Sequence, residues 1–491
     1  MIFWLAAILF LGIASCDPDG QTQGKPNIVI PPGGIRSTMM GGNTQGDDYL
    51  REENPRIDGY HHYDTPKLIK KLKELYANHY TFVIWNAPTD FEDLEKEFMP
   101  AAQKAGLQVM AYIAPPSECF DVGRCSRPHK RDYIAWAKAF AQLSVKYNKF
   151  TAWAIDDFSF NQGFFTPQYL SKVVSTFKEI NPNLGFYTTA YYFTAKDDKF
   201  LDKYGPFVNG FIYPYLDGDN SDNQRSREVA NDMDVILNHF KPRNLQLILL
   251  VYSGRFLDAT LSPDADYVKE CVEISNKYAG DNRTVGVITY GLPITDLPAV
   301  SSDNRAMYGN GRLSLAASPR STKAGDHAEA CQIVEVDPNA TRYEISFWVW
   351  DQYSGTPELK GYHYKRVILD GKIIYNFDVM DAPQMQWLQG DTGIGPVDVT
   401  HILKGKKSAK LELQLYEGKG VDNFQVDVGF DHIESIGFKV KNAEFEHKGD
   451  WNFSTTSGTL IPSIHIWHHD EPQRIFNAVS EAFKQQQNRF G

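Results

Sequence analysis

The sequence predicts an α/β protein in two folded parts, a (β/α)8 barrel and then an antiparallel β-sandwich of jelly-roll-like type. Three observations predict this. The chain has 491 residues, whereas most domains have about 100–200 and barrels about 250. From about residue 27 to 300, short apolar runs alternate with amphipathic helical stretches. After about residue 300 the hydrophobic period changes to the alternation of half-buried strands.

The first part contains eight candidate strands, each a short and nearly continuous apolar run. They are Ile28–Ile30, Thr81–Trp85, Gln108–Ile113, Phe150–Ile155, Gly185–Tyr191, Gly210–Tyr215, Gln246–Val251 and Val285–Tyr290. Helical spacing recurs between them, for example at Leu68, Leu72 and Leu75. Such strands indicate a parallel sheet covered on both faces, and eight units fit a closed barrel over 27–300. An open doubly wound sheet is the alternative, but no G-x-G-x-x-G follows the first strand.

The second part begins after a segment rich in Ser, Gly and Asn, 301–326, which we interpret as a linker. Residues 327–470 alternate apolar and polar side chains, as at Leu411, Leu413 and Leu415. Asp370-Gly371 between two apolar runs predicts a hairpin. The remaining segment, 471–491, predicts a short amphipathic helix.

The overall composition excludes several classes of protein. Hydrophobic residues make up 42% and charged residues 23% of the chain, which is ordinary for a globular protein. The formal net charge is −11, so the basic surface of a nucleic-acid binder is not expected. Aromatic residues reach 13%, which is high. The sequence does not indicate an oligomeric state.

The N-terminus predicts export. An apolar run from Phe3 to Ile13 is too short for a comfortable membrane span and is followed by small residues. Residues 13–16, Ile-Ala-Ser-Cys, resemble the lipobox of bacterial lipoproteins. That resemblance implies a signal peptide over 1–15, a lipid anchor on Cys16 and a tether over 16–26. The location would be the outer membrane or cell surface, and an ordinary cleaved signal with a periplasmic or secreted product is the alternative. In such a compartment Cys119 and Cys125 could form a disulfide.

The strongest candidate for chemistry is the pair Asp156-Asp157, directly after the fourth predicted strand. Active sites of barrels lie at the carboxyl ends of the strands, and carboxylates there are costly unless they are solvated, bonded or used. We therefore predict that the pair is catalytic. The alternative is that one aspartate caps the next helix or pairs with a core arginine.

Other candidates also follow predicted strands. Asp217 follows the sixth strand and could face the pair as a third catalytic carboxylate. Tyr and Trp offer an apolar face and a polar edge, which suits sugars. The predicted substrate-binding residues are Arg36, Trp85, Asn86, Tyr112, Glu118, Tyr191, Tyr213, Tyr215, Tyr252 and Tyr290.

No cofactor and no metal are expected. His61-His62 and the group His465, His468 and His469 lack the ligand spacing of a metal site. The sequence also contains no G-x-S-x-G elbow and no P-loop, which argues against a lipase-type hydrolase and a nucleotide enzyme.

Together, Cys16, the barrel with Asp156-Asp157 and the appended sandwich resemble exported glycoside hydrolases of Bacteroidota lipoprotein type. The adjacent pair is similar to that of substrate-assisted N-acetylglucosaminidases and hyaluronidase-like barrels. That resemblance implies that Asp156 orients the substrate's acetamido group and that Asp157 is the general acid/base. A second scheme, similar to α-galactosidase barrels, pairs Asp156 or Asp157 with Asp217.

The predicted function is cleavage of a polysaccharide or oligosaccharide at the barrel mouth, in polysaccharide degradation. The main alternative is a non-catalytic glycan-binding lipoprotein. A lyase or esterase would need a Tyr/Lys or Ser/His constellation that the sequence does not show. The sandwich could bind glycan or only support the barrel.

Overall fold

The computed structural model describes most of the chain beyond residue 36. The described residues are 37–41, 50–85, 87–119, 125–215, 226, 228–254, 263–292, 306–353, 360–381, 385–387, 396–421, 424–457, 460–466, 468 and 470–490. Within them, no helix has the length and apolarity needed to span a membrane.

Eight parallel strands close into a barrel in the order β1 to β8, and β1 pairs with both β2 and β8. The strands are β1 (Ser37–Gly41), β2 (His79–Ile84), β3 (Gln108–Ile113), β4 (Phe150–Ile155), β5 (Gly185–Thr189), β6 (Gly210–Tyr215), β7 (Gln246–Tyr252) and β8 (Gly286–Tyr290). The predicted barrel is therefore confirmed. The predicted first strand, Ile28–Ile30, lies outside the described residues, and the strand that fills the first place is β1. It lies in a segment for which the sequence predicted no strand.

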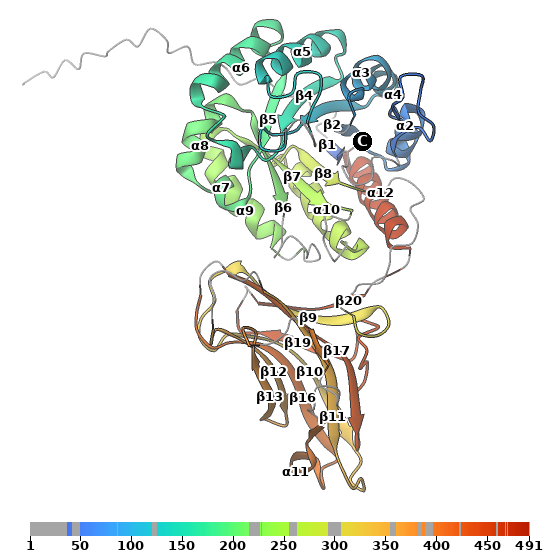
Figure 1. Cartoon of the computed structure of the whole chain (residues 1–491), viewed down its shortest axis with the longest axis vertical. Coiled ribbons are helices and arrows are strands. Elements are labelled where there is room, and N and C mark those ends of the chain that lie inside the picture. The colour runs from blue at the N-terminus through green and yellow to red at the C-terminus, as the bar shows by residue number, and fades with distance from the viewer. Residues whose placement is uncertain are drawn as a thin grey trace, which may run out of the picture.

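Helices form a ring around the barrel (Figure 1). They are α2 (Thr65–Glu74), α3 (Asp90–Asp93), α4 (Met99–Ala105), α5 (Tyr133–Lys146), α6 (Pro167–Ile180), α7 (Tyr192–Ala195), α8 (Asp198–Tyr204), α9 (Val229–Phe240), α10 (Ala265–Gly280) and α12 (Glu471–Phe490). Several start at a side-chain cap, as where Asp132 accepts from the amide of Ala135. Their apolar faces bury one core between strands and helices, which includes Trp153 and Phe177.

A second, smaller core fills the inside of the barrel, and strand parity decides which residues enter it. Successive side chains of a strand point to opposite faces. On β4, Ala152 and Ala154 therefore lie inside the barrel, while Trp153 and Ile155 pack toward the helices. This parity sets which side chains reach the barrel mouth.

The C-terminal helix α12 belongs to the barrel, although the whole sandwich precedes it in the chain. It lies beside α10 and near α2, at the edge of the ring (Figure 1). Gln486 donates to the carbonyl of Asn276 in α10, and Ser480 donates to the carbonyl of Glu74 in α2. Val479 and Phe483 are fully buried in the outer core. The segment that we predicted as a C-terminal helix thus takes the place of the helix that follows β8. The sandwich is inserted in the chain between β8 and α12.

The sandwich consists of two antiparallel sheets. One contains β13 (Lys372–Asp378), β12 (His363–Leu369), β16 (Ser408–Glu417), β10 (His327–Val336), β18 (Phe438–Lys439) and β19 (Asn452–Thr455). The other contains β14 (Met385–Trp387), β11 (Glu344–Tyr353), β17 (Phe424–Ile436), β9 (Gly311–Arg320), β20 (Leu460–Ile466) and β15 (Val397–Asp398). A short helix, α11 (Thr400–Leu403), follows β15.

Two local predictions in the sandwich have different outcomes. The hairpin is confirmed, because β12 and β13 pair across Asp370 and Gly371, both with positive φ. The predicted linker 301–326 is wrong in part, because it includes β9. Leu313 and Leu315 of β9 are fully buried in the sandwich core. The Ser- and Gly-rich composition led to the prediction of a linker where an alternating strand lies.

Candidate active site

Asp156 lies at the carboxyl end of β4 and continues the inward parity of Ala152 and Ala154. Its amide donates to the carbonyl of Ile113 at 3.0 Å, which extends the pairing of β3 with β4 by one residue. Asp157 then leaves the strand with a left-handed φ of 40°. Its amide donates to Oδ1 of Asp156 at 2.8 Å. The turn therefore holds the two carboxyls next to each other at the barrel mouth, and both are partly exposed.

Each carboxyl of the pair also accepts a hydrogen bond from a tyrosine. The hydroxyl of Tyr112 donates to Oδ1 of Asp156 at 2.6 Å, and the hydroxyl of Tyr191 donates to Oδ1 of Asp157 at 2.6 Å. Tyr252 is hydrogen-bonded in turn to Tyr191. The two aspartates are thus held by separate partners on β3 and after β5.

The electrostatics of the pair keep a proton on it. Burial raises the pKa of Asp156 to about 8, and the neighbouring charges of Asp157 and Glu118 act in the same direction. Burial also raises the pKa of Asp157, while the Tyr191 hydrogen bond acts against it. At neutral pH the pair therefore holds one acid hydrogen next to a second carboxyl, which is the arrangement that general acid catalysis requires.

A set of polar contacts that the sequence did not indicate holds the turn after Asp157. The side-chain amide of Asn161 donates to the carbonyl of Asp157 at 2.8 Å and to Oγ of Ser117 at 2.9 Å. The amide of Phe158 donates to Oγ1 of Thr189 at 3.1 Å. The loops after β3 and β4 and the end of β5 are thereby connected. These contacts join residues that are far apart in the sequence, so local patterns do not indicate them. Thr189 alone could have been suggested, by its position near the end of a predicted strand.

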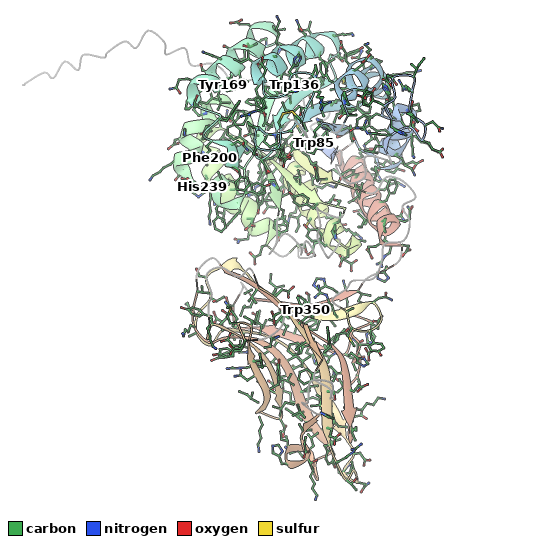
Figure 2. The ribbon with its side chains drawn as sticks, viewed as in Figure 1. Trp85, Trp136, Tyr169, Phe200, His239 and Trp350 are labelled. Atoms are coloured by element: carbon green, nitrogen blue, oxygen red, sulfur yellow. A yellow bond between two sulfur atoms is a disulfide. The ribbon has the colours of Figure 1, made fainter. Side chains whose placement is uncertain are left out.

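Four of the predicted aromatic residues lie inside the barrel. Trp85, Tyr112 and Tyr252 belong to the inner core, and Tyr290 packs against it. The rings of Trp85 and Tyr112 have centroids 5.7 Å apart, and those of Tyr252 and Tyr290 lie 5.8 Å apart. Trp85 lies toward the centre of the barrel, whereas Trp136 and Tyr169 lie in the helical ring (Figure 2). The inward aromatics therefore border Asp156 on its barrel side.

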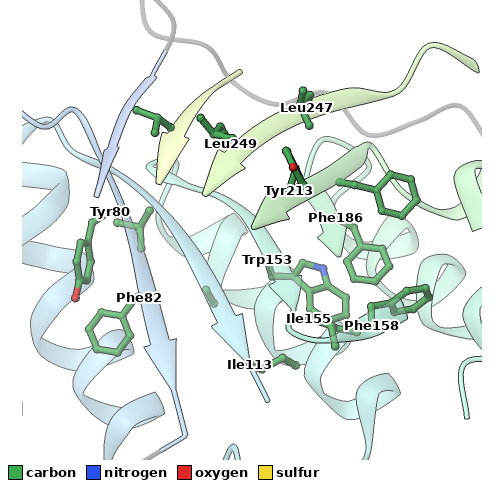
Figure 3. Packing of buried hydrophobic residues seen from close by; sticks show 14 of the residues in the cluster. Tyr80, Phe82, Ile113, Trp153, Ile155, Phe158, Phe186, Tyr213, Leu247 and Leu249 are labelled. Carbon is green, nitrogen blue, oxygen red and sulfur yellow. The ribbon is translucent and has the colours of Figure 1, made fainter. Parts of the chain in front are cut away.

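Tyr213 and Tyr215 do not join this group, which corrects our expectation. Both rings are buried in the outer core, between β6 and the helices. The hydroxyl of Tyr213 donates to Oδ2 of Asp232 in α9 at 2.8 Å. Figure 3 shows Tyr213 among the packed residues of that core, with Phe186 and Leu249. The reason is strand parity, because Ile212 is the inward residue of β6.

The remaining predicted residues have mixed placements. Glu118 is partly exposed in the loop after β3, close enough for its charge to raise the pKa of Asp156. A disulfide joins Cys119 to Cys125 beside it, as predicted. Arg36, Asn86, Asp217 and the lipidation candidate Cys16 lie outside the described residues.

One group of side chains in the described part of the chain has the composition of a metal site, His62, Asp93 and Glu97. Its polar atoms already have partners. The two ring nitrogens of His62 contact Asp93 at 2.5 Å and Asp58 at 2.8 Å, and Arg56 binds Glu97. We interpret the group as an ion-pair network that fixes the segment before α2. Of the histidines that the sequence analysis set aside as metal ligands, His465 contacts Ser463, and His469 lies outside the described residues.

Comparison with known proteins gives no family for the chain. No family model matches it. No curated protein sequence matches it either. Among solved structures, a GH99 endo-alpha-mannosidase from Bacteroides thetaiotaomicron is 14% identical, with a TM-score of 0.35, over 52% of this chain and 83% of that one.

Two further structures show how broad the similarity is. A glucosidase from Croceicoccus marinus is 10% identical, with a TM-score of 0.38, over 85% of this chain and 98% of that one. An HpcH/HpaI aldolase from Desulfitobacterium hafniense is 10% identical, with a TM-score of 0.29, over 52% and 87%. Similarity at this level indicates no activity for this chain.

Proposed function

We propose that this protein is a glycoside hydrolase that cleaves a polysaccharide or oligosaccharide at the mouth of its barrel. The observation that supports the proposal most is the adjacent pair Asp156-Asp157, in which the backbone amide of Asp157 donates to the carboxyl of Asp156 and the pKa of Asp156 is raised to about 8. Most glycosidases use two carboxyl groups, one protonated and one ionised, at the bond that is cut. Two adjacent carboxyls in one partly buried site divide into these two states.

The raised pKa of Asp156 supports one division of roles. Asp156 holds the proton at neutral pH and donates it to the leaving oxygen as the glycosidic bond breaks. Asp157, whose carboxyl accepts the hydrogen bond of Tyr191, is the ionised partner that faces the positive charge developing on the sugar. This order is the reverse of the roles implied by the resemblance to N-acetylglucosaminidases. Asp217 stays a predicted third carboxylate, because it lies outside the described residues.

The surroundings of the pair suit a sugar. Of the aromatic residues around it, Tyr191 and Tyr290 are partly exposed, and such rings offer an apolar face for C–H groups and a polar edge for hydroxyls. An exported lipoprotein location is part of the proposal. The Cys119–Cys125 disulfide supports it, because disulfides persist in oxidising compartments.

A hydrolysis screen tests the proposed function. The purified chain is incubated with a panel of oligosaccharides and polysaccharides, and newly formed reducing ends are measured. We expect cleavage of at least one glycan, with the rate reduced at least 100-fold in Asp156→Asn and in Asp157→Asn. Asp198→Asn, on the surface of α8, is the matched control and should cleave at the parent rate. If both pair variants cleave as well as the parent, the assignment is wrong. Binding without cleavage would support the glycan-binding alternative.

A further inference from the structure

The turn after β4 exposes a large aromatic side chain close to Asp157. Phe160 belongs to a short 3-10 helix, η2 (Phe158–Asn161), and is 71% exposed. Its ring centroid lies 5.1 Å from that of Tyr191, at an interplanar angle of 40°. Tyr191 is the residue whose hydroxyl donates to Asp157. The exposed ring is therefore one aromatic contact away from the carboxyl pair.

Single exposed apolar residues are common on proteins and need no explanation. Phe160 differs because the residues on both sides of it in the turn are held in place. Phe158 is fully buried and stacks on Phe165 at 4.8 Å. Asn161 is held by Asp157 and Ser117. The amide of Phe160 itself donates to the carbonyl of Asp157 at 3.2 Å. The turn therefore holds a largely uncovered aromatic ring in one place, in contact with Tyr191.

The exposure of the aromatic rings around the pair indicates where a bound glycan would lie. Trp85 and Tyr112 lie inside the barrel, on the inner side of Asp156. Phe160 lies on the solvent side, beyond Asp157. Trp85 and Tyr112 are almost fully buried, so the sugar whose bond is cut would lie at the partly exposed carboxyls of the pair, and the next sugar of the glycan would lie over Phe160. The C–H face of a pyranose suits an aromatic face of this kind.

We propose that Phe160, supported by Tyr191, is the stacking platform for the sugar next to the one whose bond is cut. This inference rests on the proposed function and deepens it. It defines the substrate as a glycan of at least two sugars, in which the second sugar offers an apolar pyranose face to Phe160. A substrate with a single sugar does not reach the platform.

Binding measurements with short sugars test the platform. The probes are mono-, di- and tetrasaccharides of glucose, mannose, galactose and N-acetylglucosamine, and the protein carries Asp157→Asn so that bound glycan is not cleaved. We expect Phe160→Ala to weaken di- and tetrasaccharide binding at least tenfold and to leave monosaccharide binding unchanged. Phe160→Trp should restore the affinity. Phe453→Ala, which removes an exposed ring from β19 of the sandwich, is the matched control and should change nothing.

The remaining outcomes distinguish a failure of the stacking platform from a failure of the proposed function. If Phe160→Ala binds every oligosaccharide like its parent, the platform is wrong, while cleavage of the same glycans by the native chain would leave the proposed function standing. An equal loss for mono- and oligosaccharides would also overturn the platform, because the ring would then contact the first sugar or shape the whole site. If no sugar is bound or cleaved by any form, the proposed function fails, and this inference fails with it.

Discussion

The hydroxyl of Tyr112 reaches from β3 to Asp156 at the end of β4 and donates a 2.6 Å hydrogen bond to its carboxyl. In the barrel register Tyr112 lies opposite Ala154, so its ring points inward and its hydroxyl extends one inward position further, to Asp156. A donor stabilises the ionised carboxylate and so lowers its pKa, against the larger effect of burial. Tyr112 thus limits how far the pKa of Asp156 rises.

Replacing this donor should shift the pH dependence of activity. In Tyr112→Phe the ionised form of Asp156 loses a hydrogen bond, so its pKa should rise further and the alkaline limb of kcat/KM should move to higher pH. We also expect a rate loss of about tenfold or more, from looser orientation of the carboxyl. The measurement is a pH profile of kcat/KM. Tyr187→Phe, which removes a hydroxyl bonded to Gln246 elsewhere in the barrel, is the control. A limb that stays in place or moves to lower pH would contradict the role of Tyr112.

The raised pKa of Asp156 also predicts how stability depends on pH. The folded chain holds this proton up to about pH 8, whereas an unfolded aspartate releases it near pH 4. Stability should therefore fall as pH rises from about 4 to about 8, by at most about 1.4 kcal/mol per pH unit for one proton. Asp156→Asn lacks this effect, so thermal melts should show the variant gaining on the parent across that window. Asp198→Asn is the control, because hydrogen bonding with His239 lowers the pKa of Asp198, so this carboxyl is ionised in the folded and unfolded chain across the window and the variant should melt in parallel with the parent. A parent and an Asp156→Asn variant that melt in parallel from pH 4 to 8 would show that the pKa is not raised.

Tyr213 should affect stability and not catalysis. Tyr213→Phe leaves Oδ2 of Asp232 without this buried donor, at a cost of about 1–3 kcal/mol. Urea unfolding measures this loss, and kcat/KM on the same preparation should equal that of the parent. A selective rise in KM at unchanged stability would instead return Tyr213 to the substrate site.

The C-terminal helix should be required for barrel stability, although the sandwich lies between them in the sequence. Phe483 is fully buried against the barrel, and Phe483→Ala should cost about 3–5 kcal/mol of unfolding free energy. Phe453→Ala removes the same ring from an exposed position and should change stability by no more than about 0.5 kcal/mol. If the two variants unfold alike, α12 does not contribute to the barrel core.

Sequence patterning predicted the barrel because strands buried on both faces leave continuous apolar runs, as at Phe150–Ile155. The pattern failed where local composition opposed it. The residues of β1, Ser-Thr-Met-Met-Gly, and the Ser- and Arg-containing β9 have the composition of loops. They form strands because they pair with neighbouring strands, which the local sequence does not show. The place of α12 in the ring was also beyond local pattern, because it depends on contacts with helices that lie about 200 residues or more before it in the chain.

The candidate site was predictable to the extent that strand position and parity determine it. Strand position identified Asp156 and Asp157. Parity, applied to every strand, would have kept Tyr112 and Tyr252 and rejected Tyr213 and Tyr215. The role of Asn161 and the exposure of Phe160 follow from one irregular turn, and no periodic pattern describes such a turn.

The most direct measurement is the pH profile of kcat/KM for the native chain and Asp156→Asn, on a glycan from the hydrolysis screen. The account predicts that native activity persists to about pH 8 and falls about tenfold per pH unit above it, as the proton leaves Asp156. Asp156→Asn should be at least 100-fold slower at every pH. An Asp156→Asn variant within about threefold of the native rate, with the same alkaline limb, would contradict the assignment of Asp156 as the acid.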